Sequence, residues 1–376
     1  MSATPASGTS RVKAMALDVA ERSARGSVVL GVAGVVLAVL WSIFRAGPTV
    51  TPSLGVIVDA ARVWPERLPG EFAAFYADSP IGLLIIRGFG SSDATSALRV
   101  GAVFMLIGLA GWAWWAWLSV DGVQRWRAAR LAVLAPITGV LATWLGFYDP
   151  FTVLAWLLVL FAWTTRSREL LIASGVVLGF QHFEHGVLGL TALTLTWWAV
   201  RQDLPERLRS MNPLWVLVGV VAGKVILLVV MAATGSALSG RTSWLSAYLL
   251  DWTKVGANTA PILLWSLFAG AWALVVAYWL AAPERASRLL LVGALAVGAL
   301  ATVLSGDRPR VFVIVMAPAL LLMTVAYLRR RADNPGELRL VESVMWLAPA
   351  ISLWGAEVVY SNVIDQAVTT WQLLIG

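Results

Sequence analysis

The sequence predicts an all-α protein, a polytopic bundle of about ten or eleven transmembrane helices. Of its 376 residues, 59% are hydrophobic and 13% are charged, about half the charged fraction of an ordinary soluble domain. The mean hydropathy is +0.78. A soluble fold of this size has no means of burying so much apolar surface, whereas a lipid bilayer accommodates it.

Apolar runs of transmembrane length recur along the whole chain. A helix rises about 1.5 Å per residue, so a hydrocarbon core of about 30 Å takes about 20 apolar residues. Three of the runs are short, and these extend into their loops or one of them is re-entrant. We predict spans near 27–46, 98–120, 131–147, 151–165, 170–181, 187–200, 213–233, 261–282, 289–305, 311–328 and 341–360.

The chain divides into a polar tail and one transmembrane domain. Residues 1–26 are polar and charged, and we expect them in the cytoplasm with a short interfacial helix at 11–25. The next apolar run has no small-residue cleavage site and is followed by Arg45 and Pro48. It is therefore interpreted as a retained anchor and not as a signal peptide. Residues 27–376 then form a single transmembrane domain without an internal repeat.

The distribution of basic residues predicts the orientation. Loops on the side of the N-terminus hold about twice as many Lys and Arg as the loops on the other side, which is typical of cytoplasmic loops. The 21 Trp residues suit the boundaries between lipid and water. We expect a multi-pass protein of the plasma (inner) membrane, surrounded by membrane lipids. The basic residues form short clusters instead of one polar face, so no nucleic-acid partner is expected.

Two long loops are predicted on the outer side, at about 47–97 and 234–260. The first mixes apolar and polar residues, which indicates one or two amphipathic helices lying in the membrane interface. The second has Trp244, Tyr248 and Trp252 at four-residue spacing, which places three aromatic rings on one helical face. Both loops are expected to lie close to the membrane surface.

Several classes of site are absent from the sequence. There is no cysteine, so neither a disulfide nor a cysteine-ligated metal is possible. The chain has no P-loop, GxGxxG, HExxH or GxSxG motif. We therefore expect no cofactor, no metal and no ATP-driven transport by this chain alone.

Acidic residues of the outer loops are the candidate catalytic bases. Asp59 and Asp78 lie in the first outer loop, where nearby lipid raises the pKa of a carboxyl group and suits it to accept a proton. Asp78 precedes Ser79 and Pro80, so a role as a helix-start residue stays open for it. For Asp59 the catalytic and structural interpretations stay equally open.

Further polar groups of the outer side are candidate substrate-binding residues. Both histidines, at three-residue spacing, share one predicted helical face with a glutamate nearby. The late arginine pair begins a span, where Asp307 and Pro309 account for a helix start and the arginines could hold a phosphate. The candidates are Arg99, Asp149, His182, Glu184, His185, Arg308 and Arg310.

One charge is predicted inside the membrane. Lys224 lies near the middle of the 213–233 span, where a charge costs about 2.5–3.5 kcal/mol on insertion scales. We expect it to face protein or water and to pair with Glu357 or Glu342. Both a functional site and a structural ion pair remain open for it.

The order of elements resembles a known family. A first span, a long outer loop with Asp59, an aromatic-Ser-Pro stretch at 75–84 and Arg99 at the second span resemble the layout of GT-C-type membrane glycosyltransferases and polymerases of cell-surface polysaccharides. The stretch 307–312 is similar to an acidic and arginine element of polysaccharide-assembly membrane proteins.

The resemblance implies a reaction and its partners. The donor would be a sugar on a polyprenyl phosphate, and the acceptor a glycan or glycolipid on the outer face. Asp59 by preference would deprotonate the acceptor hydroxyl, and Arg308 and Arg310, with Arg99, would stabilise the leaving phosphate. Two other functions stay open: a transporter or flippase that uses Lys224, and a non-catalytic membrane subunit.

Overall fold

The computed structural model describes residues 8–51, 54–68, 76–122, 124–210, 212–236, 260–282, 284–303, 308–348, 353–354 and 357–358, with the backbone alone at 8–26, 260, 262, 308, 353–354 and 357–358. Most of these residues are helical, which confirms the all-α class. Six helices are long and apolar enough to cross a membrane: Ser27–Ala46, Ala94–Ser119, Pro213–Ala233, Leu263–Ala281, Arg285–Val303 and Pro309–Arg330. They indicate a multi-pass membrane protein.

The described helices and strands occur in the following order. The first half contains α1 (Gly8–Ala46), α2 (Leu54–Val63), α4 (Pro80–Gly88), α5 (Ala94–Ser119), α6 (Gln124–Leu134), α7 (Pro136–Thr143), α8 (Asp149–Thr165) and α9 (Arg168–Val200). The second half contains η1 (Arg201–Asp203), α10 (Glu206–Arg209), α11 (Pro213–Ala233), α13 (Ala260–Phe268), η3 (Ala269–Ala271), α14 (Trp272–Ala281), α15 (Arg285–Val303), α16 (Arg308–Arg330), α17 (Pro335–Leu347), β1 (Leu353–Trp354) and β2 (Glu357–Val358).

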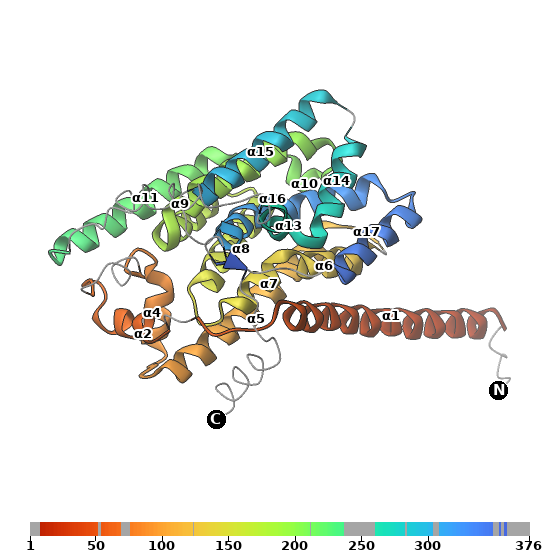
Figure 1. The fold of residues 1–376 in the computed structure, drawn as a ribbon. Helices are drawn as coiled ribbons and strands as arrows, with labels where there is room; N and C mark the ends of the chain where they lie inside the picture. Colours follow the sequence, from red (N-terminus) through yellow and green to blue (C-terminus); the bar gives the residue numbers. More distant parts are fainter. Residues whose placement is uncertain are drawn as a thin grey trace, which may run out of the picture.

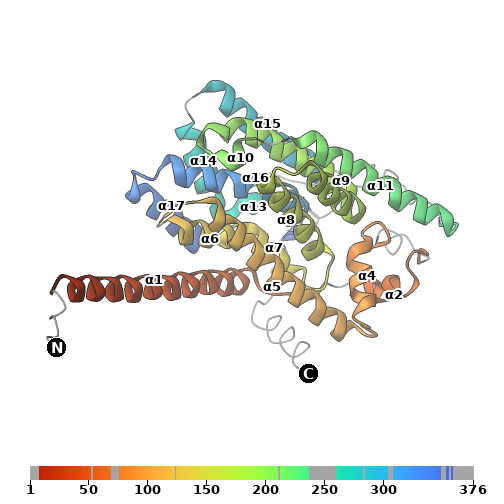
Figure 2. The same ribbon diagram turned by 180° about the vertical axis from the view of Figure 1, so that it is seen from behind.

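Helix α16 lies at the centre of the bundle and α1 lies at its edge (Figures 1 and 2). The apolar stretch of α16 is completely buried in protein, whereas that of α1 is mostly exposed and apolar. Helix α1 packs on α6, and a side-chain carbon at Gly31 would overlap the ring of Trp126. Lipid is the natural cover for the remaining face of α1, because its exposed residues are almost all Val, Leu and Phe.

Helix α9 is a hairpin of two helical arms. Its backbone becomes extended at His182, between an arm of 168–181 and an arm of 183–200. Both ends of the hairpin lie at the same end of the bundle, because Arg168 stacks on Trp215 and Arg166 donates to the carbonyl of Glu206. The predicted short spans 170–181 and 187–200 are therefore the two arms of one hairpin.

Glycines allow the first arm of α9 to lie directly against α11. Gly175 and Gly179 face Gly219 and Gly223, and a side chain at any of the four would overlap the backbone of the other helix. Small residues of this kind permit the closest approach of two membrane helices. This close packing holds the first arm of the hairpin at a fixed position along the length of α11.

Three other predicted spans differ in detail from the helices observed. The span at 131–147 is divided into α6 and α7 at Ala135, before Pro136, and the span at 261–282 is interrupted by η3. The span at 341–360 is not a continuous helix, because α17 ends at Leu347 and β1 pairs with β2 soon afterwards. Pro349 explains this end, since the residue before a proline disfavours helical geometry.

The tail and the outer loops also differ from expectation in part. Residues 11–25 belong to the continuous helix α1 and do not form a separate helix. The loop predicted at 47–97 contains two short helices, α2 and α4, while its predicted place on the outer side and in the membrane interface stays a prediction. Most of the second outer loop, including Trp244, Tyr248 and Trp252, lies outside the described residues.

The bundle has two chemically different ends. At one end, which we call the basic end, Asp203 of η1 accepts from Tyr278 and pairs with Arg330, and Arg329 pairs with Asp121. At the other end, the tip end, lie α2, α4 and the turn of the α9 hairpin (Figure 1). The N-terminal part of α1 extends toward the basic end (Figure 1).

Candidate functional site

The turn of the α9 hairpin brings both histidines together. The rings of His182 and His185 stack with centroids 3.5 Å apart and an angle of 5° between their planes, and the ring of Tyr148 lies 5.8 Å from that of His182. Both histidines are buried. The predicted proximity is present, but it arises from a break in the helix instead of a shared face of a regular one.

Gln181 connects this turn to two other elements. Its side-chain oxygen accepts from the backbone N–H groups of Ile81 and Gly82 at 3.0 and 3.3 Å, so it caps the start of α4. Its amide nitrogen lies 3.4 Å from both the carbonyl of Tyr148 and the hydroxyl of Thr152. Sequence reasoning did not select this neutral residue, although it joins α4, α8 and α9.

Lys224 of α11 pairs with the hairpin turn. Its Nζ lies 3.8 Å from Oε1 of Glu184, while Oε2 of Glu184 lies 3.5 Å from Nδ1 of His182. Lys224 also lies 5.6 Å from the centre of the Phe183 ring. The Glu184 side chain is 39% exposed, in contrast to its histidine neighbour at 1%.

Of the two expected partners of Lys224, Glu342 was wrong and Glu357 stays untested. Glu342 instead binds Arg127 and Arg130 of α6, with oxygen–nitrogen distances of 2.8 and 2.7 Å. Glu357 lies in β2, where side chains are outside the described part of the chain. A partner 40 positions away in sequence reaches Lys224 only because the hairpin turns at His182.

The site lies well inside the length of α11. Helix α11 continues for nine residues beyond Lys224, which is about 14 Å of helix. The turn after α11 contacts the residues that follow α2, because the Ser236 hydroxyl donates to the carbonyl of Pro65. The hairpin turn therefore stops short of the end of α11.

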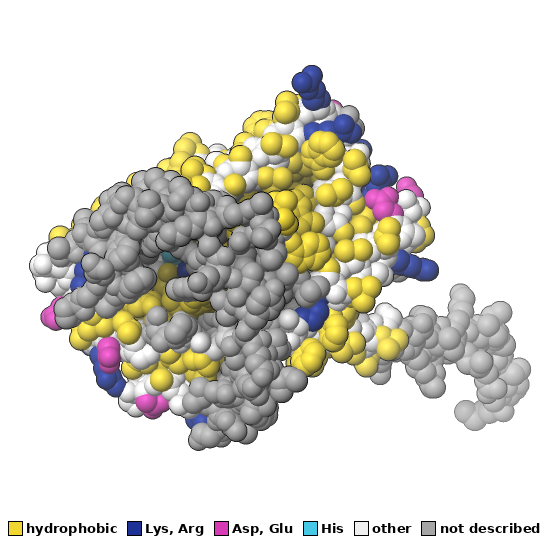
Figure 3. Space-filling view, in the orientation of Figure 1, with side chains coloured by type: hydrophobic (Ala, Val, Ile, Leu, Met, Phe, Trp, Pro, Cys, Tyr) yellow, Lys and Arg dark blue, Asp and Glu magenta, His cyan; other side chains and the backbone are white. Residues whose placement is uncertain are grey.

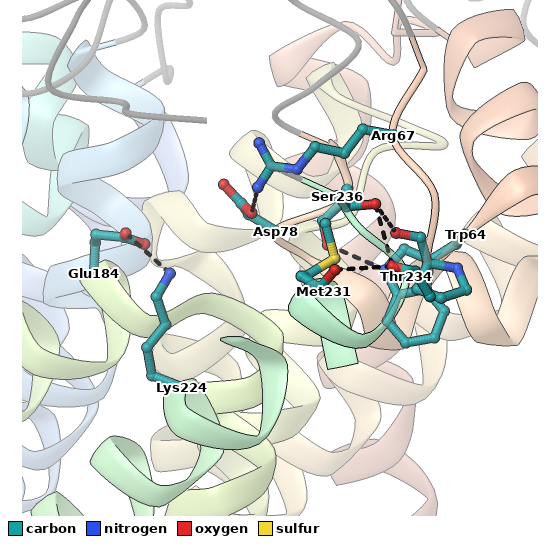
Figure 4. A network of polar contacts seen from close by, with 10 residues as sticks. Trp64, Arg67, Asp78, Glu184, Lys224, Met231, Thr234 and Ser236 are labelled. Atoms are coloured by element: carbon teal, nitrogen blue, oxygen red, sulfur yellow. Dashed lines mark hydrogen bonds and ion pairs between the residues drawn. The ribbon is translucent and has the colours of Figure 1, made fainter. Parts of the chain in front are cut away.

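A second ion pair lies close in sequence to the start of α4, which Gln181 of the hairpin binds. Arg67 and Asp78 are joined at 2.8 Å, and both side chains are largely buried. Figure 4 shows this pair between the Lys224–Glu184 pair and Trp64. Asp78 does not cap α4, since Ser79 occupies the cap position and Gln181 binds the first N–H groups. The catalytic role predicted for Asp78 stays a prediction, and its alternative role as a helix cap is not observed.

Two ion pairs and two imidazoles thus gather at one place in the fold. We call this set the tip cluster, defined as Arg67, Asp78, His182, Glu184, His185 and Lys224.

Asp149 and Arg310 form a separate buried pair. Nη1 of Arg310 lies 2.9 Å from each oxygen of Asp149, whose side chain is 0% exposed. The guanidinium is surrounded by aromatic rings, with centroids at 5.0 Å for Trp144 and 4.6 Å for Phe147. A buried charge is strongly destabilising without its partner. The Asp149–Arg310 pair therefore holds α8 against α16. Arg308 begins α16, but its side chain is outside the described atoms.

Asp59 and Arg99 lie at the surface of the tip end. Asp59 forms an exposed pair with Arg62, one turn away on α2, and within the described chain no hydrogen bond or ion pair joins it to the tip cluster. Arg99 is exposed on α5. The side chain of Asp93 caps the start of α5 by accepting a hydrogen bond from the backbone N–H of Ser96. This hydrogen bond lowers the pKa of the Asp93 carboxyl group.

The tip cluster has the groups needed for proton transfer and anion binding. Glu184 offers an exposed carboxylate, and Lys224 and Arg67 offer positive charge from different elements. Among the residues that the structure describes, no group of three His, Cys, Asp or Glu side chains is arranged to hold a metal ion.

No family model, curated protein or solved structure matches this chain. Its function is therefore argued from the geometry of the site.

Proposed function

We propose that the protein is a glycosyltransferase of the plasma (inner) membrane that acts in cell-envelope glycan assembly. It takes a sugar from a polyprenyl-phosphate-linked donor and transfers it to a glycan or glycolipid acceptor on the outer face. The observation that carries this proposal is the tip cluster: Glu184, a carboxylate 39% exposed, lies 3.8 Å from the cation of Lys224, and a second cation, Arg67, is held by Asp78 shortly before α4.

The reaction assigns a role to each of these groups. Glu184 accepts the proton of the acceptor hydroxyl as the oxygen bonds to the anomeric carbon of the donor sugar. The bond from that carbon to the phosphate oxygen breaks, and the polyprenyl phosphate leaves with the electron pair. Lys224 and Arg67 stabilise the negative charge that develops on the phosphate. His182 supports the turn that carries Glu184, because its Nδ1 atom accepts from the backbone N–H of His185.

The geometry moves the catalytic assignment away from Asp59. Its carboxylate is bound by Arg62 on the exposed face of α2. Asp78 is retained as a positioning residue, because it holds the guanidinium of Arg67 at 2.8 Å. Asp149 is inaccessible to a substrate, so we assign it and Arg310 to the support of α8 and α16.

The apolar exposed face of α11 next to the tip cluster suits a donor with a hydrophobic polyprenyl chain. Val221, Val225 and Val229 follow one another along an exposed face of α11, and Lys224 lies at the border between this face and the buried face. A polyprenyl chain lying on these valines would bring its phosphate to Lys224 without leaving the bilayer.

A transfer assay with Glu184→Gln tests the proposal. The purified protein is incubated with radiolabelled polyprenyl-phosphate sugars and a membrane glycolipid fraction, and labelled product is measured. Loss of a general base slows such steps by about 10²–10⁴-fold, so E184Q should lose nearly all transfer while Asp59→Asn retains it. Undiminished transfer by E184Q would overturn the assignment.

A transporter or flippase is the second candidate, and broken helices favour it. Transport sites are typically formed where membrane helices are interrupted near the middle of the bilayer. The α9 turn at His182, the α6–α7 break and η3 are three such interruptions. If proteoliposomes move a polyprenyl-phosphate sugar across the bilayer without any transfer, and Lys224→Met stops this movement, the second candidate replaces the first.

A further inference from the structure

Four arginines at the basic end stack on tryptophan rings. Arg125 lies 4.6 Å from the centre of the Trp117 ring, and Arg288 lies 5.3 Å from that of Trp279. The other two pairs are Arg168 on Trp215, at 3.6 Å, and Arg201 on Trp198, at 4.5 Å. The pairs come from different connections between helices, yet all lie at the same end of the bundle.

The four arginines differ in their hydrogen bonds. Arg125 donates to the carbonyl of Val120, and Arg288 donates to that of Ala282. Within the described chain, neither Arg168 nor Arg201 donates a hydrogen bond or lies within ion-pair distance of a carboxylate. A tryptophan covers the flat face of each guanidinium but leaves the N–H groups in its plane available.

These two arginines flank the base of the α9 hairpin. Arg168 is its first residue and Arg201 follows its last, and both are exposed. Trp198 beside them is 48% exposed. In Figure 3, Lys and Arg side chains gather along the edge where the start of α15 and α17 lie, next to a broad hydrophobic surface.

We propose that Arg168–Trp215 and Arg201–Trp198 are binding sites for the headgroups of anionic phospholipids in the leaflet at the basic end. The planar guanidinium suits the two oxygens of a phosphodiester. Tryptophan fixes the height of each arginine at the boundary between lipid and water. The acyl chains then lie on the adjoining apolar surface, which distinguishes a lipid from a soluble phosphate.

Native mass spectrometry of the detergent-purified chain tests this assignment. Phosphatidylglycerol and phosphatidylcholine are titrated against the natural protein, and each bound lipid adds its mass. Removing one arginine near a membrane surface costs about fivefold in binding of an anionic lipid. We expect R168Q and R201Q each to weaken phosphatidylglycerol binding by that factor, and phosphatidylcholine binding to be weak throughout.

Arg285→Gln is the matched control, because Arg285 is an exposed arginine that begins α15 at the same end. It should leave phosphatidylglycerol binding unchanged, and Arg168→Lys should lose part of it because lysine has no planar face. Equal losses in R285Q and R168Q would contradict the proposal, as would equal binding of both lipids. Displacement of phosphatidylglycerol by millimolar glycerol 3-phosphate would replace the lipid by a soluble phosphate and overturn it too.

Discussion

The two ends of the bundle hold charges in opposite ways. At the tip end, Asp149 and Arg310 are withdrawn from water and surrounded by aromatic rings. At the basic end, Asp203 and Arg330 form a similar pair whose side chains remain 17% and 25% exposed. The basic end has more arginines than the tip end, although the candidate catalytic site lies at the tip end. The number of charged residues alone therefore does not identify a candidate site. What distinguishes the tip end is the complete burial of the Asp149 carboxylate beside Arg310.

The largest expected effect is the loss of the buried pair. Arg310→Met leaves the Asp149 carboxylate without its partner in a dry environment, and this costs about 3–5 kcal/mol of unfolding free energy. The matched change at the other end, Arg330→Gln, should cost about 1 kcal/mol or less. Thermal unfolding in detergent measures both. Equal losses would show that the two ends do not differ as described.

A double variant sharpens this contrast. Asp149→Leu combined with Arg310→Met removes both charges, so no carboxylate is left unpaired, and replacement of a buried pair by apolar residues is often close to neutral. We expect the double variant to be more stable than Arg310→Met alone. A double variant that is less stable than either single one would show that the pair contributes net attraction.

The next effect concerns the cap of α4. Gln181→Leu leaves the N–H groups of Ile81 and Gly82 without their acceptor, at a cost of about 1–3 kcal/mol for a buried unsatisfied group. Gln202→Leu, on the exposed surface of η1, is the control and should change the unfolding free energy by about 0.5 kcal/mol at most. Identical unfolding temperatures for the two variants would contradict the stabilising role of the Gln181 side chain at the start of α4.

A smaller effect is expected at the basic end. Tyr278→Phe removes one hydrogen bond, 2.7 Å long, to Asp203, which is worth about 1 kcal/mol. Asp203 keeps its contact with Arg330, so the variant should retain both its fold and its transfer activity. A loss above about 3 kcal/mol would mean that this end is as strictly organised as the tip end.

The smallest effect is expected at Asp59. Its exposed pair with Arg62 on the same helix is worth about 0.3–0.5 kcal/mol. Asp59→Asn should therefore change neither stability nor transfer beyond this level. A large loss of transfer with normal folding would return Asp59 to the catalytic role that the sequence favoured.

The sequence predicted helices better than contacts. The span at 213–233 coincides with α11 because an uninterrupted apolar run has few alternatives. The end of α17 was missed although Pro349 follows two residues after it. The two arms of the hairpin coincide with the predicted spans at 170–181 and 187–200, but the turn between them is shorter than predicted, because only His182 leaves helical geometry.

The candidate residues were selected for their charge, so only charged and imidazole groups were found. Lys224 and Glu184 were both selected, but their pairing depends on how the α9 hairpin packs against α11, which apolar periodicity does not show. Asp149 and Arg310 are 161 positions apart, and only the packing of α16 against α8 joins them. Gln181 carries no charge, so no sequence signal distinguished it from other polar residues.

Site-directed labelling tests most directly whether the tip cluster faces the compartment opposite the basic end. The chain has no native cysteine, so Glu184→Cys and Asn334→Cys each provide a single target, one in the cluster and one exposed at the basic end. A membrane-impermeant maleimide added to intact cells should label position 184 and leave position 334 unlabelled until the membrane is opened. Labelling of position 334 alone, or of both positions from the outside, would contradict a substrate site on the outer face.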